Sequence, residues 1–170
     1  PKKKTASLLG VCYDVVEVLV ASLACIVLLF TFLFRVVGVE GDSMMDTLYG
    51  GDRLILCPAL SSPDRGDIVV INRYTDEPLV KRVIGVAGDT LEIDEELHRV
   101  RLNGELLDEP YVQYPTPAYD MTGEVAVPEG YVFVMGDHRN DSHDSRAADI
   151  GLVPVDDIVG WAAFRIWPPQ

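Results

Sequence analysis

The feature that most constrains this chain is an apolar run near its start, where residues Val18–Phe34 hold seventeen consecutive side chains without a charge. Extended to Val15–Val39, the run reaches twenty-five residues, of which only Glu17 and Arg35 are charged. A helix of about 20 apolar residues crosses the hydrocarbon core of a bilayer. We therefore predict a transmembrane helix over residues 15–39. A buried core helix and a cleavable secretory signal are the two alternatives.

Charge is distributed unevenly on the two sides of this run. Residues 1–39 carry four basic and two acidic side chains, whereas residues 40–170 carry ten basic and twenty-five acidic ones, within a formal net charge of -13. Three lysines at positions 2–4 precede the run, so the positive-inside rule predicts a cytoplasmic segment 1–14 and an extracytoplasmic domain 40–170 on a single-pass protein of the cell membrane. Membrane lipid is then an expected partner. An acidic domain repels phosphate backbones, which argues against nucleic acid.

Beyond the apolar run, short alternating apolar stretches broken by Gly, Pro and Asp predict a mostly β structure. The predicted fold class is an N-terminal transmembrane helix followed by a largely antiparallel β domain. The Asn103-Gly104 pair between two apolar stretches predicts a tight hairpin. The expected strands are Arg53–Leu56, Asp67–Asn72, Leu79–Val86, Thr90–Ile93, Val100–Leu102, Glu124–Val127, Tyr131–Met135 and Ile158–Trp167.

The cysteines do not point to a disulfide framework or to a zinc site. Cys12 and Cys25 lie in or beside the apolar run and Cys57 stands alone, with no CxxC pattern and no Cys/His cluster. We therefore expect no metal and no cofactor.

Lys81 is the only lysine in residues 40–170, although the same stretch holds nine arginines. Arginine stays protonated in proteins, whereas burial lowers the pKa of a lysine from ~10.4 towards neutrality, so only lysine can serve as a base. On a strand, the same-face neighbours of Lys81 are Leu79 and Val83, which would keep water from the amine. An ordinary surface lysine lying along apolar neighbours is the alternative.

Two further segments combine small, polar and charged residues. The first, Gly41–Leu48, closely follows the apolar run and contains Ser43, for which a simple turn is the alternative. The second is Gly136–Arg146, which follows an expected strand. Within it, Asp144 and Arg146 are placed to form an ion pair that fixes Ser142 or Ser145. A solvated loop is the alternative there.

These segments and the lysine strand together resemble the bacterial type I signal peptidases, membrane-bound Ser/Lys proteases that remove signal peptides from exported proteins. The resemblance covers essentially the whole chain: the apolar run, the Ser-Met segment 43–48, the Lys-Arg-Val-Ile-Gly-Val-Ala-Gly-Asp run 81–89 and the Gly-Asp…Asp-Ser-Arg loop 136–146. It implies a serine endopeptidase with a largely β catalytic domain and a small β excursion at 94–123. Its partners would be exported preproteins with small residues before the cleaved bond.

The resemblance also implies roles for individual residues. Ser43 would be the nucleophile and Lys81 the general base, while Ser142 would hold the lysine amine by a hydrogen bond. Asp144, Arg146 and Asp137 would support the site. The backbone N–H of Ser43, with the backbone at Gly41, would stabilise the oxyanion, and one such donor is worth roughly 3–4 kcal/mol.

The sequence departs from the commonest family pattern at three positions. Asp46 stands where proline is usual, His138 stands where asparagine is usual, and Gly41 stands where some members offer a hydroxyl to the oxyanion. Three alternatives to a Ser/Lys signal peptidase are considered. They are a Ser-His-Asp site built on His143, a membrane-tethered β binding module without catalysis, and a self-cleaving Ser/Lys regulator, which would lack the apolar run.

Overall fold

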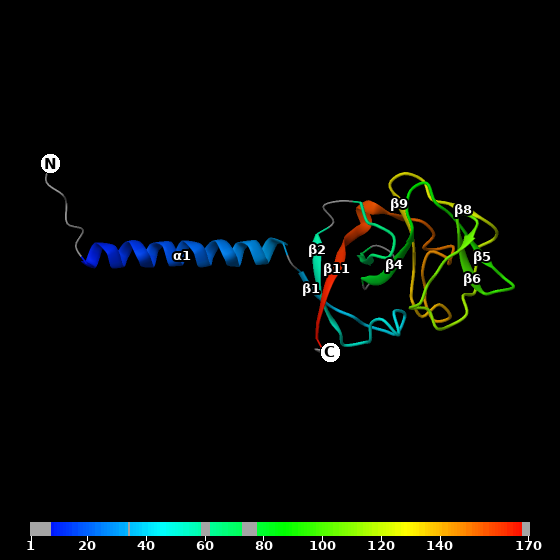
Figure 1. Ribbon diagram of the computed structural model, residues 1–170, viewed down its shortest axis with the longest axis horizontal. Helices are drawn as coiled ribbons and strands as arrows, with labels where there is room; N and C mark the ends of the chain where they lie inside the picture. Colours follow the sequence, from blue (N-terminus) through cyan, green and yellow to red (C-terminus); the bar gives the residue numbers. More distant parts are fainter. Residues whose placement is uncertain (1–7, 34, 59–61, 73–77, 168–170) are drawn as a thin grey trace. The chain divides into compact units, whose positions relative to one another are not determined.

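The computed structural model describes residues 8–33, 35–58, 62–72 and 78–167. The chain divides into two units, Pro1–Arg35 and Val36–Gln170, each described by itself. The first unit holds a helix and the second holds two β-sheets (Figure 1).

The helix of the first unit, α1 (Leu8–Leu33), has 26 residues. Its stretch Gly10–Leu28 is long and apolar enough to cross a membrane, and none of that stretch is buried. At 1.5 Å per residue the helix is about 39 Å long, more than the ~30 Å of a bilayer core. The core helix of a soluble domain is, by contrast, mostly buried.

The helix differs from the expected span of 15–39 at both ends. It begins at Leu8, because the uncharged residues before Asp14 continue the helical stretch, and it ends at Leu33. Residues Arg35–Gly38 form strand β1 instead, which is a neighbour of β2 in the main sheet. Valine is stiff at χ1 and packs well on a pleated surface, so this valine-rich end of the apolar run favours a strand once a partner is present.

The main sheet has seven strands in the order β1-β2-β11-β3-β4-β9-β10. Its registered pairs from β2 to β10 are antiparallel. Strand β4, which carries Lys81, lies inside the sheet and is paired with β3 on one side and β9 on the other. After β1, its strands are β2 (Arg53–Pro58), β3 (Ile68–Ile71), β4 (Leu79–Gly85), β9 (Tyr131–Met135), β10 (Val153–Pro154) and β11 (Ile158–Trp167).

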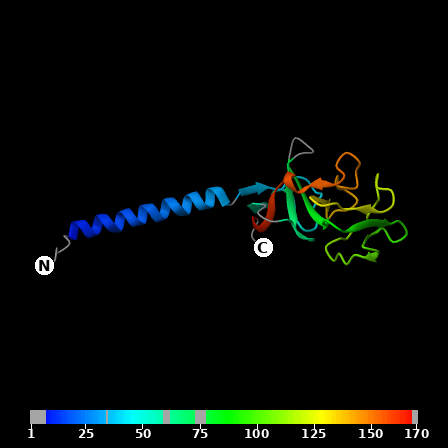
Figure 2. The ribbon, with the colours of Figure 1, turned by 90° about the horizontal axis from the view of Figure 1, so that it is seen from above.

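A small sheet is inserted between β4 and β9, in the order β7-β6-β5-β8. Figures 1 and 2 show it at the end of the second unit opposite to β1 and β2. The Asn103-Gly104 turn has φ of 53° and 83°, the positive values that a type I′ hairpin requires, so the predicted hairpin is confirmed. The strands are β5 (Thr90–Asp94), β6 (Arg99–Leu102), β7 (Glu105–Leu106) and β8 (Val125–Ala126).

The predicted fold class is confirmed: an N-terminal apolar helix is followed by antiparallel β-sheets. Each of the eight expected strands overlaps an observed strand, whereas β1, β7 and β10 were not expected. The small sheet also extends beyond the expected excursion of 94–123. Its strand β5 begins at Thr90, before that range, and pairs with β8, which follows it.

Apolar clusters join these elements and hold the segment that contains Ser43. One cluster packs Ile84 and Phe133 of the main sheet against Leu91 of the small sheet. Another packs Met44 and Leu48 against the main sheet. Val39 belongs to the same cluster, so the main-sheet core anchors the chain both before and after the candidate nucleophile.

Candidate active site

Ser43 lies in a tight turn between β1 and β2. Backbone hydrogen bonds close the turn, from the Met45 N–H to the Asp42 carbonyl (3.0 Å) and from the Leu48 N–H to the Met44 carbonyl (2.8 Å). Met44 and Leu48 are buried, whereas Ser43 is half-buried. Two apolar anchors thus hold the turn while the serine hydroxyl remains partly open to solvent.

The amine of Lys81 reaches this serine from β4. Lys81 Nζ donates a hydrogen bond to Ser43 Oγ over 2.6 Å. Lys81 is only 3% exposed. Side chains alternate along a strand, so Leu79 and Val83 share its face of β4, and both pack in an apolar cluster of the main sheet. The structure therefore joins the two candidate residues in a site largely shielded from water.

The surroundings of Lys81 favour a neutral amine. Burial lowers the pKa of Lys81 from its ordinary 10.5 to about 8, and the Arg146 guanidinium acts in the same direction. The carboxylates of Asp144, Asp137 and Asp141 oppose the shift. At this pKa about a tenth of the amines are neutral at pH 7, against roughly one in three thousand for an unshifted lysine.

Asp144 and Arg146 form the predicted ion pair. Arg146 donates from Nε to Oδ1 (2.8 Å) and from Nη2 to Oδ2 (2.7 Å), and both side chains are fully buried. The Gly136 N–H also donates to Asp144 Oδ2 (3.0 Å). Burial by itself raises the pKa of Asp144, but the Arg146 guanidinium and the Gly136 N–H outweigh it and hold that pKa below its ordinary value. The carboxylate is therefore charged at neutral pH.

Ser142 contacts this ion pair rather than the lysine. Its hydroxyl donates to Asp144 Oδ2 over 2.7 Å, and the described contacts include no hydrogen bond between Ser142 and the amine of Lys81. The expected Ser142–Lys81 bond is thus not seen in this structure. A hydroxyl has one proton to donate, and here it is directed to a buried carboxylate. The lone pairs of the oxygen remain available to an ammonium group.

Asp137 connects the nucleophile turn to β4. Its fully buried carboxylate accepts two hydrogen bonds from Arg82, from Nε (2.8 Å) and Nη2 (2.6 Å), and a third from Thr47 Oγ1 (2.5 Å). Thr47 belongs to the turn of Ser43, and Arg82 follows Lys81 in the strand. The same carboxylate thus holds both candidate catalytic residues through their neighbours in sequence.

Residues 136–146, which we call the catalytic loop, press closely on the nucleophile turn at Gly136. A Cβ atom at this position would overlap Ser142 Oγ and the Ser43 carbonyl oxygen, so the approach requires glycine. The His138 N–H donates to the same Ser43 carbonyl (3.1 Å). The His138 ring lies 3.2 Å from the Asp42 carbonyl through Nδ1 and packs on Tyr114. The histidine that replaces the usual asparagine therefore still contacts the turn.

The remaining expected features of the turn concern the oxyanion. Gly41 has a φ of 76°, which favours glycine, so its position before the turn is explained by the backbone conformation. Among the described residues, no partner accepts a hydrogen bond from the Ser43 N–H. Asp46, which stands where proline is usual, accepts a hydrogen bond from the Tyr49 hydroxyl (3.4 Å).

The rival base His143 is paired elsewhere. Its Nε2 lies 2.8 Å from Asp149 Oδ2, and both side chains are exposed, at 52% and 70%. An exposed histidine that is paired with a surface carboxylate is not held against Ser43. Within the described part of the chain, no group of three His, Cys, Asp or Glu side chains is arranged to hold a metal ion, and the cysteines are unpaired.

Sequence reasoning missed a second buried ion pair beside the site, between Arg139 and Glu109. Arg139 is in the catalytic loop, but Glu109 lies thirty residues earlier, after β7. No local pattern connects the two positions. One signal could have revealed it: the loop holds two arginines, Arg139 and Arg146, but only one ion-pair partner, Asp144, was expected for them.

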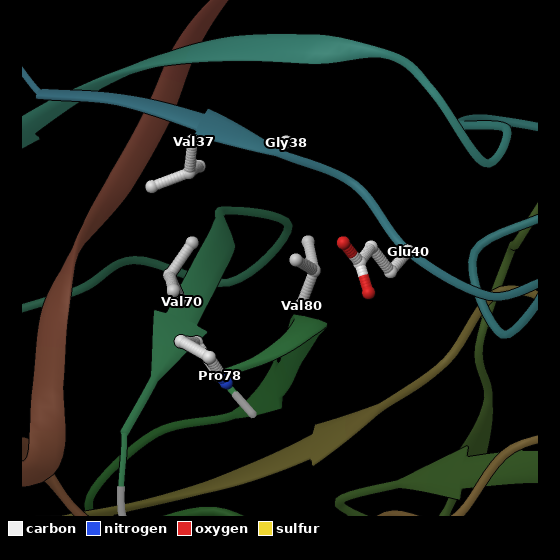
Figure 3. Close-up of a pocket in the computed structure, with 6 residues that line it drawn as sticks. All are labelled: Val37, Gly38, Glu40, Val70, Pro78 and Val80. Atoms are coloured by element: carbon white, nitrogen blue, oxygen red, sulfur yellow. The ribbon is translucent and has the colours of Figure 1, made fainter. Parts of the chain in front are cut away.

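A pocket lies beside the two segments of the chain that carry Ser43 and Lys81. It has a volume of about 170 Å³, and its lining is mostly apolar apart from Glu40 (Figure 3). Val80 directly precedes Lys81, and Glu40 lies three residues before Ser43. Figure 3 shows the Glu40 carboxylate turned towards Val80. The lining residues are Val37, Gly38, Glu40, Val70, Pro78 and Val80.

An apolar N-terminal helix, an antiparallel β domain and a serine hydroxyl bonded to a buried lysine amine define a class of protein, the serine proteases that carry an apolar helix. Comparisons with known proteins narrow this class. The family model described as signal peptidase, peptidase S26, matches residues 12–167.

Similar proteins agree with that match. The signal peptidase I of Bacillus caldolyticus is 38% identical over 152 residues, with 81% of each chain covered. Signal peptidase I S of Bacillus subtilis (strain 168) is 35% identical over 164 residues, covering 89% of this chain and 87% of that protein. A crystal structure of a signal peptidase I from Enterococcus faecalis V583 matches with a TM-score of 0.50 and 28% identity, over 61% of this chain and 98% of that one.

The chain belongs to the signal peptidase family, peptidase S26. It is a serine endopeptidase that removes signal peptides, and its substrates are preproteins. The alternatives of a non-catalytic β module and a self-cleaving regulator are thereby set aside.

Proposed function

We propose that Ser43 is the nucleophile of this signal peptidase and that Lys81 is its general base, acting without metal or cofactor. One observation carries the proposal: the buried Lys81 Nζ lies 2.6 Å from Ser43 Oγ. A hydroxyl is a weak nucleophile until a neighbouring base accepts its proton. A neutral lysine within hydrogen-bond reach supplies that base without an imidazole.

The reaction follows from these two groups. Neutral Lys81 accepts the proton of the Ser43 hydroxyl as Oγ attacks the scissile carbonyl carbon, which forms a tetrahedral oxyanion. The Lys81 ammonium then gives its proton to the leaving amine, the C–N bond breaks, and the signal peptide stays attached to Oγ as an ester. A water molecule, deprotonated in turn by Lys81, attacks this ester. The Lys81 ammonium then returns the proton to Ser43 Oγ as the bond between Oγ and the acyl carbon breaks, which frees the peptide and the serine hydroxyl.

The Ser43 N–H is the oxyanion donor in this proposal, with the backbone at Gly41 beside it. The lack of a described partner for this N–H supports the assignment, and the positive φ of Gly41 lets the chain turn just before the donor. Loss of one such donor typically costs about 3–4 kcal/mol of transition-state stabilisation.

Ser142, Asp144, Arg146 and Asp137 are supporting residues in the proposal. Asp144 and Arg146 fix the catalytic loop, and Ser142 is bonded to Asp144. We propose that the lone pairs of Ser142 accept from the Lys81 ammonium when the base is protonated. Asp137 keeps the turn and β4 in register through Thr47 and Arg82.

The pocket of Figure 3 is the proposed subsite for a side chain of the signal peptide close to the cleaved bond. Its volume of about 170 Å³ is large enough for a small apolar side chain. Signal peptides carry small residues near the cleavage site, which suit shallow apolar subsites. Val37, Val70 and Val80 supply the apolar surface.

We also propose that α1 is retained as a membrane anchor, with the N-terminus in the cytoplasm and the catalytic domain outside. The basic residues before the helix and the acidic domain after it support this orientation. A single cysteine placed at the exposed Glu129, in a background without native cysteines, should then react with a membrane-impermeant maleimide in intact cells. Labelling only after cell lysis would reverse the orientation.

The assignment of the dyad is tested by cleavage of a fluorogenic signal-peptide substrate. Ser43→Ala and Lys81→Ala should each lower kcat/KM by at least about 100-fold, because a general base or its nucleophile is lost. Ser62→Ala, at an exposed position outside the site, serves as the matched control and should behave as wild type. More than a tenth of wild-type activity in a folded Ser43→Ala variant would refute the assignment.

A further inference from the structure

We propose that residues 109–119, here called the bracing segment, position the catalytic loop during peptide cleavage, with Glu109 as the main positioning residue. The segment follows β7 and belongs to the insertion between β4 and β9 that carries the small sheet. The inference rests on the function proposed above, because it concerns how the loop is held against Ser43 and Lys81.

The first contact of the bracing segment is with Arg139. The side chain of Arg139 is fully buried, and Glu109 is nearly so. Glu109 accepts from Arg139 Nη1 (2.9 Å) through one carboxylate oxygen and from Nη2 through the other, while Thr116 Oγ1 lies 3.3 Å from Nη1. A buried guanidinium is strongly destabilising without a counter-charge. Glu109 therefore determines whether Arg139 stays in place.

Arg139 transmits this contact to the loop's closest approach to the nucleophile. Its Nε donates to the Gly136 carbonyl over 3.0 Å. Gly136 is the residue that has no room for a Cβ atom against Ser142 Oγ and the Ser43 carbonyl. A shift of Glu109 thus reaches the nucleophile turn through one side chain and one peptide group.

The second contact of the bracing segment is with Arg146. Arg146 Nη1 donates to the Pro117 carbonyl (3.0 Å), and the guanidinium lies 4.4 Å above the Tyr119 ring. The Tyr119 hydroxyl also donates to the Arg139 carbonyl (3.3 Å). Asp144 accepts from Nε and Nη2 of Arg146, so this guanidinium is held between the loop and the bracing segment.

The third contact lies beside β4. The Tyr111 ring packs against the Arg82 guanidinium at 4.1 Å, and its hydroxyl donates to Glu109 Oε1 (3.0 Å). Arg82 holds Asp137. Each arginine that supports the catalytic loop therefore has a second contact with the bracing segment, which is more than packing of an insertion on its host domain requires.

A positioning role has a consequence for the base. The charged groups around Lys81 are Asp144, Arg146, Asp137 and Asp141, and burial is the largest influence on its amine. A loosened loop admits water to Lys81, which raises the pKa of the amine. Withdrawal of Arg146 acts in the same direction, whereas withdrawal of the carboxylates opposes it. The rising limb of kcat/KM against pH should then move to higher pH.

The test compares Glu109→Gln with wild type in the full-length protein, with a soluble signal-peptide substrate. A displacement of about 1 Å costs up to 10²-fold in rate. We expect kcat to fall about 10- to 100-fold, KM to stay within about twofold, and the rising limb to move upwards, with partial recovery in Glu109→Asp. The matched control is Asp94→Asn, which breaks the Asp94–Arg101 pair within the small sheet and should leave kcat and the pH profile at wild-type values.

A second variant covers the case in which Glu109→Gln does not fold. Tyr119 is 46% exposed, and its positive φ of 53° suits asparagine, so Tyr119→Asn removes the ring from Arg146 at little cost to folding. We expect kcat to fall about threefold, as for loss of one cation–π contact, with an upward shift of the limb. Wild-type kcat and pH profile in the folded variants would overturn the bracing role. Activity in Ser43→Ala would instead refute the dyad and leave the brace untouched.

Discussion

Lys81 and Arg146 are two buried cations of one site, and their surroundings have opposite effects. They are 3% and 1% exposed, respectively. The described hydrogen-bond partner of Lys81 is a neutral hydroxyl, whereas Arg146 has a bidentate carboxylate, a backbone carbonyl and an aromatic ring. Burial lowers the pKa of Lys81 to about 8. What burial does to a cation thus depends on whether a counter-charge is buried in direct contact with it.

The difference suits the two residues to the different tasks that we propose for them. A buried cation without a direct carboxylate partner has a lowered pKa and loses its proton more easily, as a base must. A cation fixed by two parallel hydrogen bonds keeps its charge and its position, which a support requires. Both tasks need burial, but only the second needs Asp144.

Among the variants that test this comparison, Lys81→Arg is expected to have the largest effect. Arginine keeps the charge and the approximate length but cannot lose a proton, so turnover should fall 10²- to 10⁴-fold, the usual range for loss of a general base. Cleavage of a soluble peptide measures it. Arg65→Lys, at a guanidinium that is 49% exposed, is the control and should be near wild type. If Lys81→Arg kept more than about a tenth of wild-type turnover, Lys81 would not be the base.

A smaller effect is expected for Asp144→Asn, which changes the partner of the supporting residue Arg146. The change leaves Arg146 buried without its counter-charge, which typically costs about 3–5 kcal/mol of unfolding free energy. Denaturant unfolding would measure this loss against Asp94→Asn, where the partly exposed pair with Arg101 should contribute much less. Equal losses in the two variants would show that burial of the Asp144–Arg146 pair has no energetic importance.

The smallest effect concerns the stability cost of the base itself. The folded pKa of Lys81, about 8, lies below its ordinary 10.5, so the unfolded chain binds a proton more tightly and folding is opposed at low pH. The cost, about 3 kcal/mol, is complete below pH 8, fades between pH 8 and 10.5, and is absent above. Lys81→Met should therefore be more stable than wild type by about 1–3 kcal/mol at pH 7, and less so at pH 10. A variant less stable than wild type at pH 7 would contradict this.

The burial of Lys81 could be predicted from the sequence because its evidence is local, although a surface lysine was the alternative. A lone lysine between apolar strand neighbours indicates a buried amine, and the observed burial agrees. The predicted helix wrongly included the valine-rich residues of β1. An apolar run in the sequence does not reveal that its last residues will pair with another strand. The Glu109–Arg139 pair was missed for a related reason: a thirty-residue separation has no periodicity to reveal it. Ser142 was expected on the lysine, but the competition between Asp144 and Lys81 for one hydroxyl is decided by geometry.

The most direct test of the central claim is a titration of Lys81 by NMR in protein labelled with ¹³C-lysine. The chain has four lysines, three of them at positions 2–4, so the Lys81 signal is identified by its absence from Lys81→Arg. Because the amine is buried without a direct carboxylate partner, we expect its titration midpoint at pH about 8. A midpoint near the ordinary 10.5 would show that Lys81 stays charged at neutral pH, and Lys81 would not be the base.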